Sequence, residues 1–303
     1  MTNERKPQTL FQAYCELTKI KLSLLVVMST AVAFVMASEL GIDWMAFLWT
    51  VIGTTLSAAA AATWNQLFEH KRDAKMSRTK DRPIPSGRIS ILHAFVVGVL
   101  LTYGGLSVLA FGANPAAAGV SLLTILTYVF VYTPLKPRTS FNTFIGAIVG
   151  AFPPLLGWVA AVGSLSGGAW IFGGILFLWQ IPHFMALAWK YKDEYEHGGF
   201  IMLPSLDPSG DLTGRVSILT ALCLVPLCLL FTLEGVASTV FAVVGSMLSL
   251  WYTYVAFRFW RNPSNGTAVK MFLTSIMYLP LLFVLMLLTR QYVDFVPISM
   301  VTP

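Results

Sequence analysis

Apolar residues gather in nine long stretches, at about 22–40, 44–64, 91–111, 114–134, 141–163, 168–189, 214–233, 236–257 and 270–290. An α-helix rises about 1.5 Å per residue, so about 20 apolar residues cross the roughly 30 Å hydrocarbon core of a bilayer. Each stretch is near that length. The pattern therefore predicts an all-α, polytopic membrane protein with nine transmembrane helices in one bundle, forming a single domain over residues 1–303.

The composition supports this class. Hydrophobic residues make up 56% of the chain and charged residues only 11%, whereas about a quarter of the residues of a soluble domain are charged. This deficit excludes ordinary soluble, disordered, fibrous and disulfide-scaffold proteins, because too little polar surface is available to face water. The polar residues 1–21 lack the apolar core of a signal peptide, so we expect insertion through the first helix itself.

Basic residues are distributed unevenly between the two ends of the predicted helices. With a cytosolic N-terminus, one face contains 1–21, 65–90, 135–140, 190–213 and 258–269; with the adjoining Arg215 and Lys270, this face holds 19 of the 20 Lys and Arg residues. The bias predicts a multi-pass protein of a bacterial plasma membrane, with the N-terminus and both long loops cytosolic. It also predicts that the basic segments contact the lipid bilayer and bind no nucleic acid.

Three oxygen-bearing side chains, Asn65, Glu69 and Asp73, open the first long loop at a spacing of four residues. If the second helix continues beyond the membrane, these side chains stack along one helix face. Carboxylate and amide oxygens suit Mg²⁺, whose shell is commonly completed by phosphate oxygens and water. The row therefore predicts a magnesium site.

Basic residues follow this row closely: Lys71, Arg72, Lys75, Arg78 and Arg82. Cations beside carboxylates are typical of a site for a diphosphate and its metal. The alternative is a solvated loop whose charges only stabilise a helix through i, i+4 pairs. The register of the row at a membrane exit, followed by Arg-x-x-x-Arg-Pro, favours the binding site.

The second long loop carries Asp193 and Glu194, and then Gly198-Gly199, which ends any helix and lets the chain fold back. Alone, this segment is compatible with an ordinary helix terminus. Because it lies on the same predicted side as the first loop, we expect the two to form one metal-diphosphate site, with Asp193, Glu194 or both as ligands.

Several motifs resemble the UbiA superfamily of intramembrane prenyltransferases: Asn65-x-x-x-Glu69-x-x-x-Asp73, Met76-x-Arg78-Thr79-x-x-Arg82-Pro83-x-Pro85-x-Gly87, and Tyr195…Gly199-x-x-Met202-Leu203-Pro204. Together with Pro182-His183-Phe184, they are most similar to the branch that acts on protohaem IX. The chain departs from the usual superfamily pattern in having Glu69 at an Asp position, and His197 where the second cluster normally repeats Asp.

The resemblance implies transfer of a farnesyl group from farnesyl diphosphate to a vinyl group of protohaem IX, with addition of water, giving haem O for a downstream enzyme that forms haem A. It implies Mg²⁺ held by Asn65, Glu69, Asp73, Asp193 and Glu194, while Lys75, Arg78 and Arg82 assist departure of the diphosphate. A helix-lined apolar cavity would hold the prenyl chain and shield the allylic cation from water.

His183 lies within the sixth predicted helix and, if that helix is continuous, shares a stripe with Lys190 and Glu194. An intramembrane histidine is a functional candidate, although it can equally be hydrogen-bonded between helices. We expect His183 to contact the haem or ligate its iron, and we place Lys190 and the arginines Arg78 and Arg82 with it among the ligand-binding residues.

Two other functions compete with this one. A prenyltransferase that acts on an aromatic quinone precursor would share the diphosphate site. A non-catalytic haem or lipid transporter would be expected to bury ionisable residues near the bilayer midplane, whereas this chain gathers its charges at one face.

Overall fold

The computed structural model describes residues 9–38 and 41–291, in which every named element is a helix. The first half contains α1 (Leu10–Leu17), α2 (Ile20–Ala37), α3 (Trp44–Asp73), α4 (Ile91–Gly112), α5 (Pro115–Leu126), the π-helix η1 (Thr127–Tyr132), α6 (Thr133–Leu135) and α7 (Asn142–Val162). The second half contains α8 (Gly167–Lys190), α9 (Lys192–His197), α10 (Leu203–Leu206), α11 (Asp211–Leu222), α12 (Leu224–Leu233), α13 (Thr239–Arg261) and α14 (Asn265–Leu288).

Eight helices of the described chain are long and apolar enough to cross a membrane. One of them combines α5, η1 and α6 as Pro115–Leu135, and another combines α11 and α12 as Asp211–Leu233. The remaining predicted stretch, 22–40, corresponds to α2, whose apolar part Ser23–Ala37 is shorter than a full span, and residues 39–40 lie outside the described residues. The membrane bundle is confirmed, but a count of nine spans is not.

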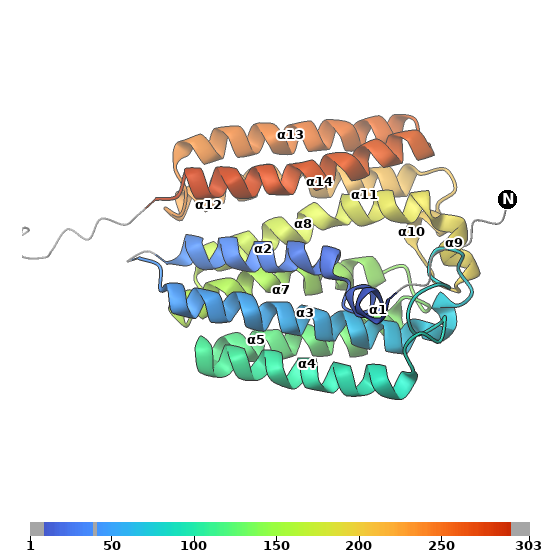
Figure 1. Cartoon of the computed structure of the whole chain (residues 1–303). Helices are drawn as coiled ribbons and strands as arrows, with labels where there is room; N and C mark the ends of the chain where they lie inside the picture. The colour runs from blue at the N-terminus through green and yellow to red at the C-terminus, as the bar shows by residue number, and fades with distance from the viewer. Residues whose placement is uncertain (1–8, 39–40, 292–303) are drawn as a thin grey trace, which may run out of the picture.

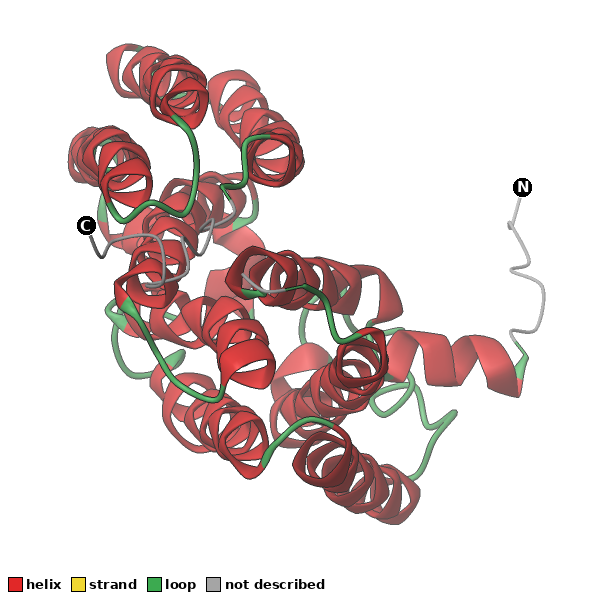
Figure 2. Cartoon of the chain, turned by 90° about the vertical axis from the view of Figure 1, so that its left-hand side faces the viewer, coloured by secondary structure: helices red, strands yellow, loops and turns green. Residues whose placement is uncertain are grey.

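The long helices lie side by side along one common direction (Figure 1), and Figure 2 shows them nearly end-on. In the first half α2 packs on α3 and α7, and α4 packs on α3 and α5. In the second half α13 contacts α11, α12 and α14. The helix α8 contacts both α7 and α14, so it joins the two halves of the bundle.

The two long connections lie at the same end of the bundle, as the charge pattern predicts. Residues 74–90 and the short helices α9 and α10 gather beside α1 at the right of Figure 1. The helix α3 has 30 residues, which at about 1.5 Å each exceeds the thickness of the hydrocarbon core. Its last turns therefore project toward this end and carry the Asn65, Glu69 and Asp73 side chains.

Candidate active site

The predicted row of oxygen ligands forms on α3, which continues without a break to Asp73. The exposed fractions of Asn65, Glu69 and Asp73 are only 1%, 5% and 1%. Burial of two carboxylates is expensive unless each meets a counter-charge or hydrogen-bond donor. The helical register expected from the sequence is therefore confirmed, and the burial of the row distinguishes it from a solvated helix face.

Each member of this row contacts one basic side chain from another segment. Lys19 Nζ donates to Asn65 Oδ1 at 2.8 Å. Lys136 Nζ pairs with Glu69 Oε1 at 2.8 Å, and Arg82 Nη1 pairs with Asp73 Oδ2 at 2.7 Å. Of these three cations only Arg82 was predicted.

Lys19 and Lys136 were missed because no local motif contains them. Lys19 lies at the junction of α1 and α2, and Lys136 follows α6. One feature of the sequence could have identified them: both lie at the end of an apolar stretch, on the same predicted side of the membrane as the row. Only the packing of α2 and η1 against α3 brings them to Asn65 and Glu69.

The two lysines differ in their electrostatic surroundings. Burial, reinforced by the charges of Arg82 and Lys136, lowers the pKa of Lys19 to about 7. Burial alone would also lower the pKa of Lys136, but the adjacent Glu69 carboxylate, together with Tyr132, raises it above its usual value. Lys136 is therefore a fixed positive charge, while Lys19 is the less firmly protonated of the two.

Two more of the predicted cations of the first loop are exposed, as expected for groups that meet a ligand from water. Lys75 and Arg78 both lie on the surface. The Arg78 guanidinium carbon lies 5.2 Å from the ring centroid of Tyr191 and 5.9 Å from that of Tyr195. These cation–π contacts hold Arg78 against the second loop.

The second loop folds back over the first, as its glycines predicted. The helix α9 ends at His197, and Gly199 adopts a φ of 69°, a left-handed conformation that glycine allows without strain. Met76 from the first loop then packs with Ala188, Phe200 and Met202 in a small hydrophobic cluster. The two loops therefore form one layer over the end of the bundle.

The second acidic cluster does not join the α3 row directly. Glu194 accepts a hydrogen bond from the Ser77 hydroxyl. This bond, with the backbone N–H groups of Arg78 and Ser77, holds the pKa of Glu194 below its usual value. Asp193 is exposed, and its carbonyl oxygen contacts His197 Nδ1. The part of the chain that the structure describes contains no cluster of three His, Cys, Asp or Glu side chains poised around a metal ion.

The donors that do converge nevertheless fit Mg²⁺. Glu69 and Asp73 supply hard carboxylate oxygens, Asn65 supplies an amide oxygen, and all three lie buried along α3. Mg²⁺ usually takes one or two carboxylates and completes its shell with water and phosphate oxygens. The row could thus hold the ion together with a diphosphate. A role for Asp193 and Glu194 as ligands stays a prediction.

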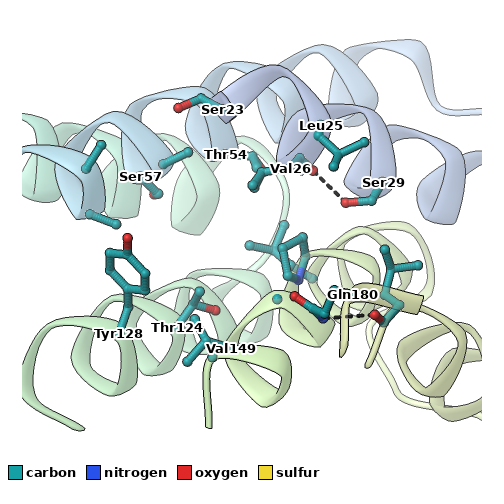
Figure 3. Close-up of a pocket in the computed structure, with 18 of the residues that line it drawn as sticks. Ser23, Leu25, Val26, Ser29, Thr54, Ser57, Thr124, Tyr128, Val149 and Gln180 are labelled. Carbon is teal, nitrogen blue, oxygen red and sulfur yellow. Dashed lines mark hydrogen bonds between the residues drawn. The ribbon is translucent and has the colours of Figure 1, made fainter. Parts of the chain in front are cut away.

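A mostly apolar cavity of about 340 Å³ extends from this end into the bundle between α2, α3, α5, η1, α7 and α8. Lys19 and Tyr132 line it, which connects it to the row, since Lys136 Nζ lies 4.6 Å from the Tyr132 ring centroid. Figure 3 shows Tyr128 and Thr124 facing Ser23 and Thr54 across the cavity. Its mostly apolar lining, with Lys19 beside the row, suits a long apolar chain with an anionic head.

The π-helix η1 places two tyrosines on this cavity. Thr133 donates its hydroxyl to the carbonyl oxygen of Tyr128, five residues earlier, within the widened turn. Tyr128 and Tyr132 both line the cavity, with ring centroids 5.3 Å apart. Such π-bulges are frequent at functional sites because they re-aim side chains without ending the helix.

His183 also lines the cavity, on the α8 wall. Its ring is stacked between Trp179 and Phe272, with centroid distances of 5.3 and 4.9 Å. Its Nδ1 lies 2.7 Å from Ser275 Oγ of α14. The hydrogen bond between helices that was expected as the alternative role of His183 is therefore present. It uses Nδ1 and leaves Nε2 available.

The predicted stripe holds from His183 to Lys190, which lie seven residues apart within α8, but its extension to Glu194 is wrong. The helix α8 ends at Lys190, and Tyr191 leaves the helical conformation with φ −115° and ψ 26° before α9 begins. The change of direction interrupts the register because a helical spacing holds only within one continuous helix. Lys190 is exposed, with its Nζ 5.0 Å from the Tyr191 ring centroid.

Sequence comparison identifies relatives of nearly the full length of the chain. The profile of the UbiA prenyltransferase family matches residues 26–287. Protoheme IX farnesyltransferase of Solibacter usitatus is 39% identical over 286 residues, covering 91% of this chain and 98% of that protein. The Opitutus terrae protein of the same name is 40% identical over 283 residues, covering 93% and 96%. The human mitochondrial protein of that name is 38% identical over 275 residues, covering 91% and 61%.

Solved structures share the fold. A structure of digeranylgeranylglyceryl phosphate synthase superposes with a TM-score of 0.77 at 17% identity, covering 92% of this chain and 98% of that one. A UbiA homolog from Archaeoglobus fulgidus, bound to DMAPP and Mg²⁺, gives a TM-score of 0.68 at 16% identity, covering 90% and 98%.

Proposed function

Because the chain belongs to the UbiA prenyltransferase family, we propose that it transfers a farnesyl group from farnesyl diphosphate to a vinyl group of protohaem IX. The observation that carries this proposal is the buried row of Asn65, Glu69 and Asp73 with its cations at the mouth of an apolar cavity. The names of relatives at 38–40% identity support the choice of farnesyl donor and haem acceptor.

The anionic head of the donor binds at the row. Asn65, Glu69 and Asp73, with Asp193 and Glu194 of the second loop, would hold Mg²⁺, which would supply positive charge that stabilises the departing diphosphate. Arg82 already lies at Asp73. The exposed Lys75 and Arg78 would reach the outer phosphate oxygens, Arg78 by leaving the rings of the second loop. A preorganised cluster of cations lowers the barrier because it stabilises charge that develops in the transition state.

The reaction needs a dry cavity for the prenyl chain. The bond between C1 of the farnesyl group and the diphosphate oxygen breaks, and the diphosphate leaves with the electron pair. A vinyl carbon of the haem forms the new carbon–carbon bond. Water then adds to the neighbouring carbon and loses a proton, which gives haem O. The rings of Tyr128 and Tyr132 line the cavity and exclude water until that last step.

The acceptor meets the cavity on the α8 wall. His183, which lines the cavity, is placed to contact the haem or ligate its iron, and Lys190 lies exposed at the end of the same helix. The charge distribution supports a bacterial plasma membrane protein with this face cytosolic. The product would then pass to an enzyme that forms haem A.

Mass spectrometry of haems provides the test. Membranes that contain the full chain are incubated with protohaem, farnesyl diphosphate and Mg²⁺, and the molecular masses of the extracted haems are measured. We expect a farnesylated, hydrated haem that disappears on chelation of Mg²⁺ and in Asp73→Ala. Unchanged product after either treatment, or prenylation of an aromatic quinone precursor in place of haem, would overturn the proposal.

A further inference from the structure

Gln180 on α8 presents an unpaired oxygen to the cavity. Its side chain is 5% exposed and lines the cavity. Its Nε2 donates to the carbonyl oxygens of Ala147 and Leu176, both at 2.9 Å, and Figure 3 shows one of these bonds. The two bonds use both amide protons and fix the carboxamide, whose Oε1 has no hydrogen-bond partner among the described residues. Such a buried acceptor costs free energy unless a ligand or a water molecule pairs with it.

Gly150 on α7 leaves the space in which this oxygen lies. A Cβ atom at position 150 would be 2.1 Å from Gln180 Oε1, much closer than two unbonded atoms approach. Gly150 itself lines the cavity, so Oε1 lies at the cavity wall. Glycine at this position therefore allows the oxygen to face the cavity.

His183 provides a second acceptor one turn further along α8. Its Nδ1 lies 2.7 Å from Ser275 Oγ, whose own proton is donated to the carbonyl oxygen of Phe272. The histidine therefore donates at Nδ1 and keeps a lone pair on Nε2. Residues three apart on one helix are neighbours on the same face, and both Gln180 and His183 line the cavity.

Two neighbouring acceptors select a ligand with two protons to donate. The farnesyl chain and the vinyl group of haem have none, and a haem carboxylate would be repelled by both atoms. Water meets the requirement because it donates one proton to Oε1 and the other to Nε2. The cavity of about 340 Å³ has room for a water molecule. The oxygen lone pairs of this water then point away from α8, into the cavity.

We propose that Gln180 and His183 hold the water molecule that adds to the haem. This rests on the proposed function. Once farnesyl C1 has bonded to one vinyl carbon, the neighbouring carbon is a cation. The water oxygen forms a bond to that carbon, one proton passes to His183 Nε2, and the proton on Gln180 Oε1 stays in the new hydroxyl group. The rings of Trp179 and Phe272, which stack on His183 with centroid distances of 5.3 and 4.9 Å, stabilise the imidazolium.

The identity of the product tests this assignment. Without a held water, the cation instead loses a proton from the adjacent carbon and becomes an alkene, which is lighter by one water molecule. Membranes that contain the full chain are supplied with protohaem, farnesyl diphosphate and Mg²⁺, and mass spectrometry gives the ratio of hydrated to dehydrated farnesyl haem. We expect the hydrated product to dominate in the wild-type chain and the ratio to fall about tenfold in Gln180→Leu, which removes one of the two hydrogen bonds to the water.

Gly150→Ala changes the same oxygen without altering Gln180. The new Cβ atom forces the carboxamide to move, so the ratio should fall as it does in Gln180→Leu. Alanine favours a helix, so this variant is expected to fold. Its control is Gly119→Ala on α5, where a Cβ atom has nothing within 4 Å and the ratio should not change.

Gln66→Leu is the matched control for Gln180→Leu. Gln66 is also buried, and its Nε2 also donates to two backbone carbonyl oxygens, those of Glu16 and Leu17 at 2.8 and 3.0 Å. Its Oε1 likewise has no partner within the described chain, but Gln66 lies outside the cavity lining. Gln66→Leu should therefore keep the wild-type ratio. A fall equal to that in Gln180→Leu would overturn the inference.

Two further outcomes would overturn the inference and leave the proposed function standing. The first is a wild-type ratio in both Gln180→Leu and Gly150→Ala. The second is a visible spectrum of the haem complex that shows an iron ligand lost in His183→Leu, because iron on Nε2 would take the place of the water. Absence of any farnesylated haem from the wild-type reaction would overturn the proposed function and the inference together.

Discussion

His183 Nδ1 lies 2.7 Å from Ser275 Oγ, and the Ser275 hydroxyl donates in turn to the carbonyl oxygen of Phe272 at 2.6 Å. A hydroxyl has one proton to donate, so the histidine must be the donor at Nδ1. The neutral ring then has its lone pair on Nε2. A histidine that lines the cavity is thus held in the tautomer that can bind a metal ion or accept a proton.

This relationship predicts the effect of Ser275→Ala. If Nε2 ligates haem iron, loss of the partner at Nδ1 should weaken haem binding about 10-fold to 100-fold, and Ser275→Thr should restore part of it. Titration with haem, followed in the visible spectrum, measures this. Ser246→Ala is the control because Ser246 is a half-buried serine on α13 whose buried hydroxyl has no partner among the described residues. An unaltered spectrum in Ser275→Ala would exclude this role.

Asp73→Asn should reduce the rate of farnesyl transfer. The substitution keeps the size of the side chain but removes the charge that pairs with Arg82 at 2.7 Å. We expect a loss of about 100-fold or more, in the range found when one electrostatic contact to a transition state is removed. Initial rates at saturating Mg²⁺ give the comparison. Glu196→Gln, which alters an exposed carboxylate on α9, should retain full activity.

Ser121→Phe should change the preferred length of the prenyl chain. Ser121 is 1% exposed, lines the cavity on α5, and its hydroxyl has no partner within the described chain, so the substitution fills space without breaking a contact. We expect farnesyl diphosphate to lose at least tenfold in kcat/KM relative to dimethylallyl diphosphate. Leu122→Phe adds bulk one residue along but at a position that is 41% exposed, and should leave the ratio unchanged. Equal ratios in both variants would place the prenyl chain elsewhere.

Asp207 is expected to stabilise the connection before α11. Its Oδ2 accepts from the Thr213 N–H at 2.8 Å, and its Oδ1 accepts from the Ser209 hydroxyl at 2.9 Å. Burial raises the pKa of Asp207, but these hydrogen bonds outweigh it, and the pKa lies below its usual value. Asp207→Ala should lower the free energy of unfolding by about 1 kcal/mol, measured by thermal unfolding in detergent.

The sign of the pH dependence follows from that lowered pKa. The carboxylate form binds better in the folded chain, so its contribution is complete above the unfolded pKa near 3.8 and declines as the pH falls through the lower folded value. The difference in stability between the wild-type chain and Asp207→Ala should therefore be constant near neutral pH and shrink below about pH 4. A difference that persists undiminished in acid would contradict the assignment.

The sequence alone determined the membrane class, most of the spans, the shared face of the two long loops and the row of Asn65, Glu69 and Asp73. These properties depend on local hydrophobicity, charge and helical spacing, which are read over a few turns of one segment. The predicted stripe does not reach from His183 to Glu194, because Tyr191 ends α8 and helical spacing does not apply across the break.

Only the tertiary structure decided which side chains meet. Lys19 and Lys136 reach the row from positions 46 and 67 residues away in the chain, and Ser275 reaches His183 from 92 residues away. Glu194 turned toward Ser77 of the first loop. Such pairs arise from the packing of several helices at once, which leaves no periodic trace in any one segment, so the acidic row was predictable and its cation partners were largely not.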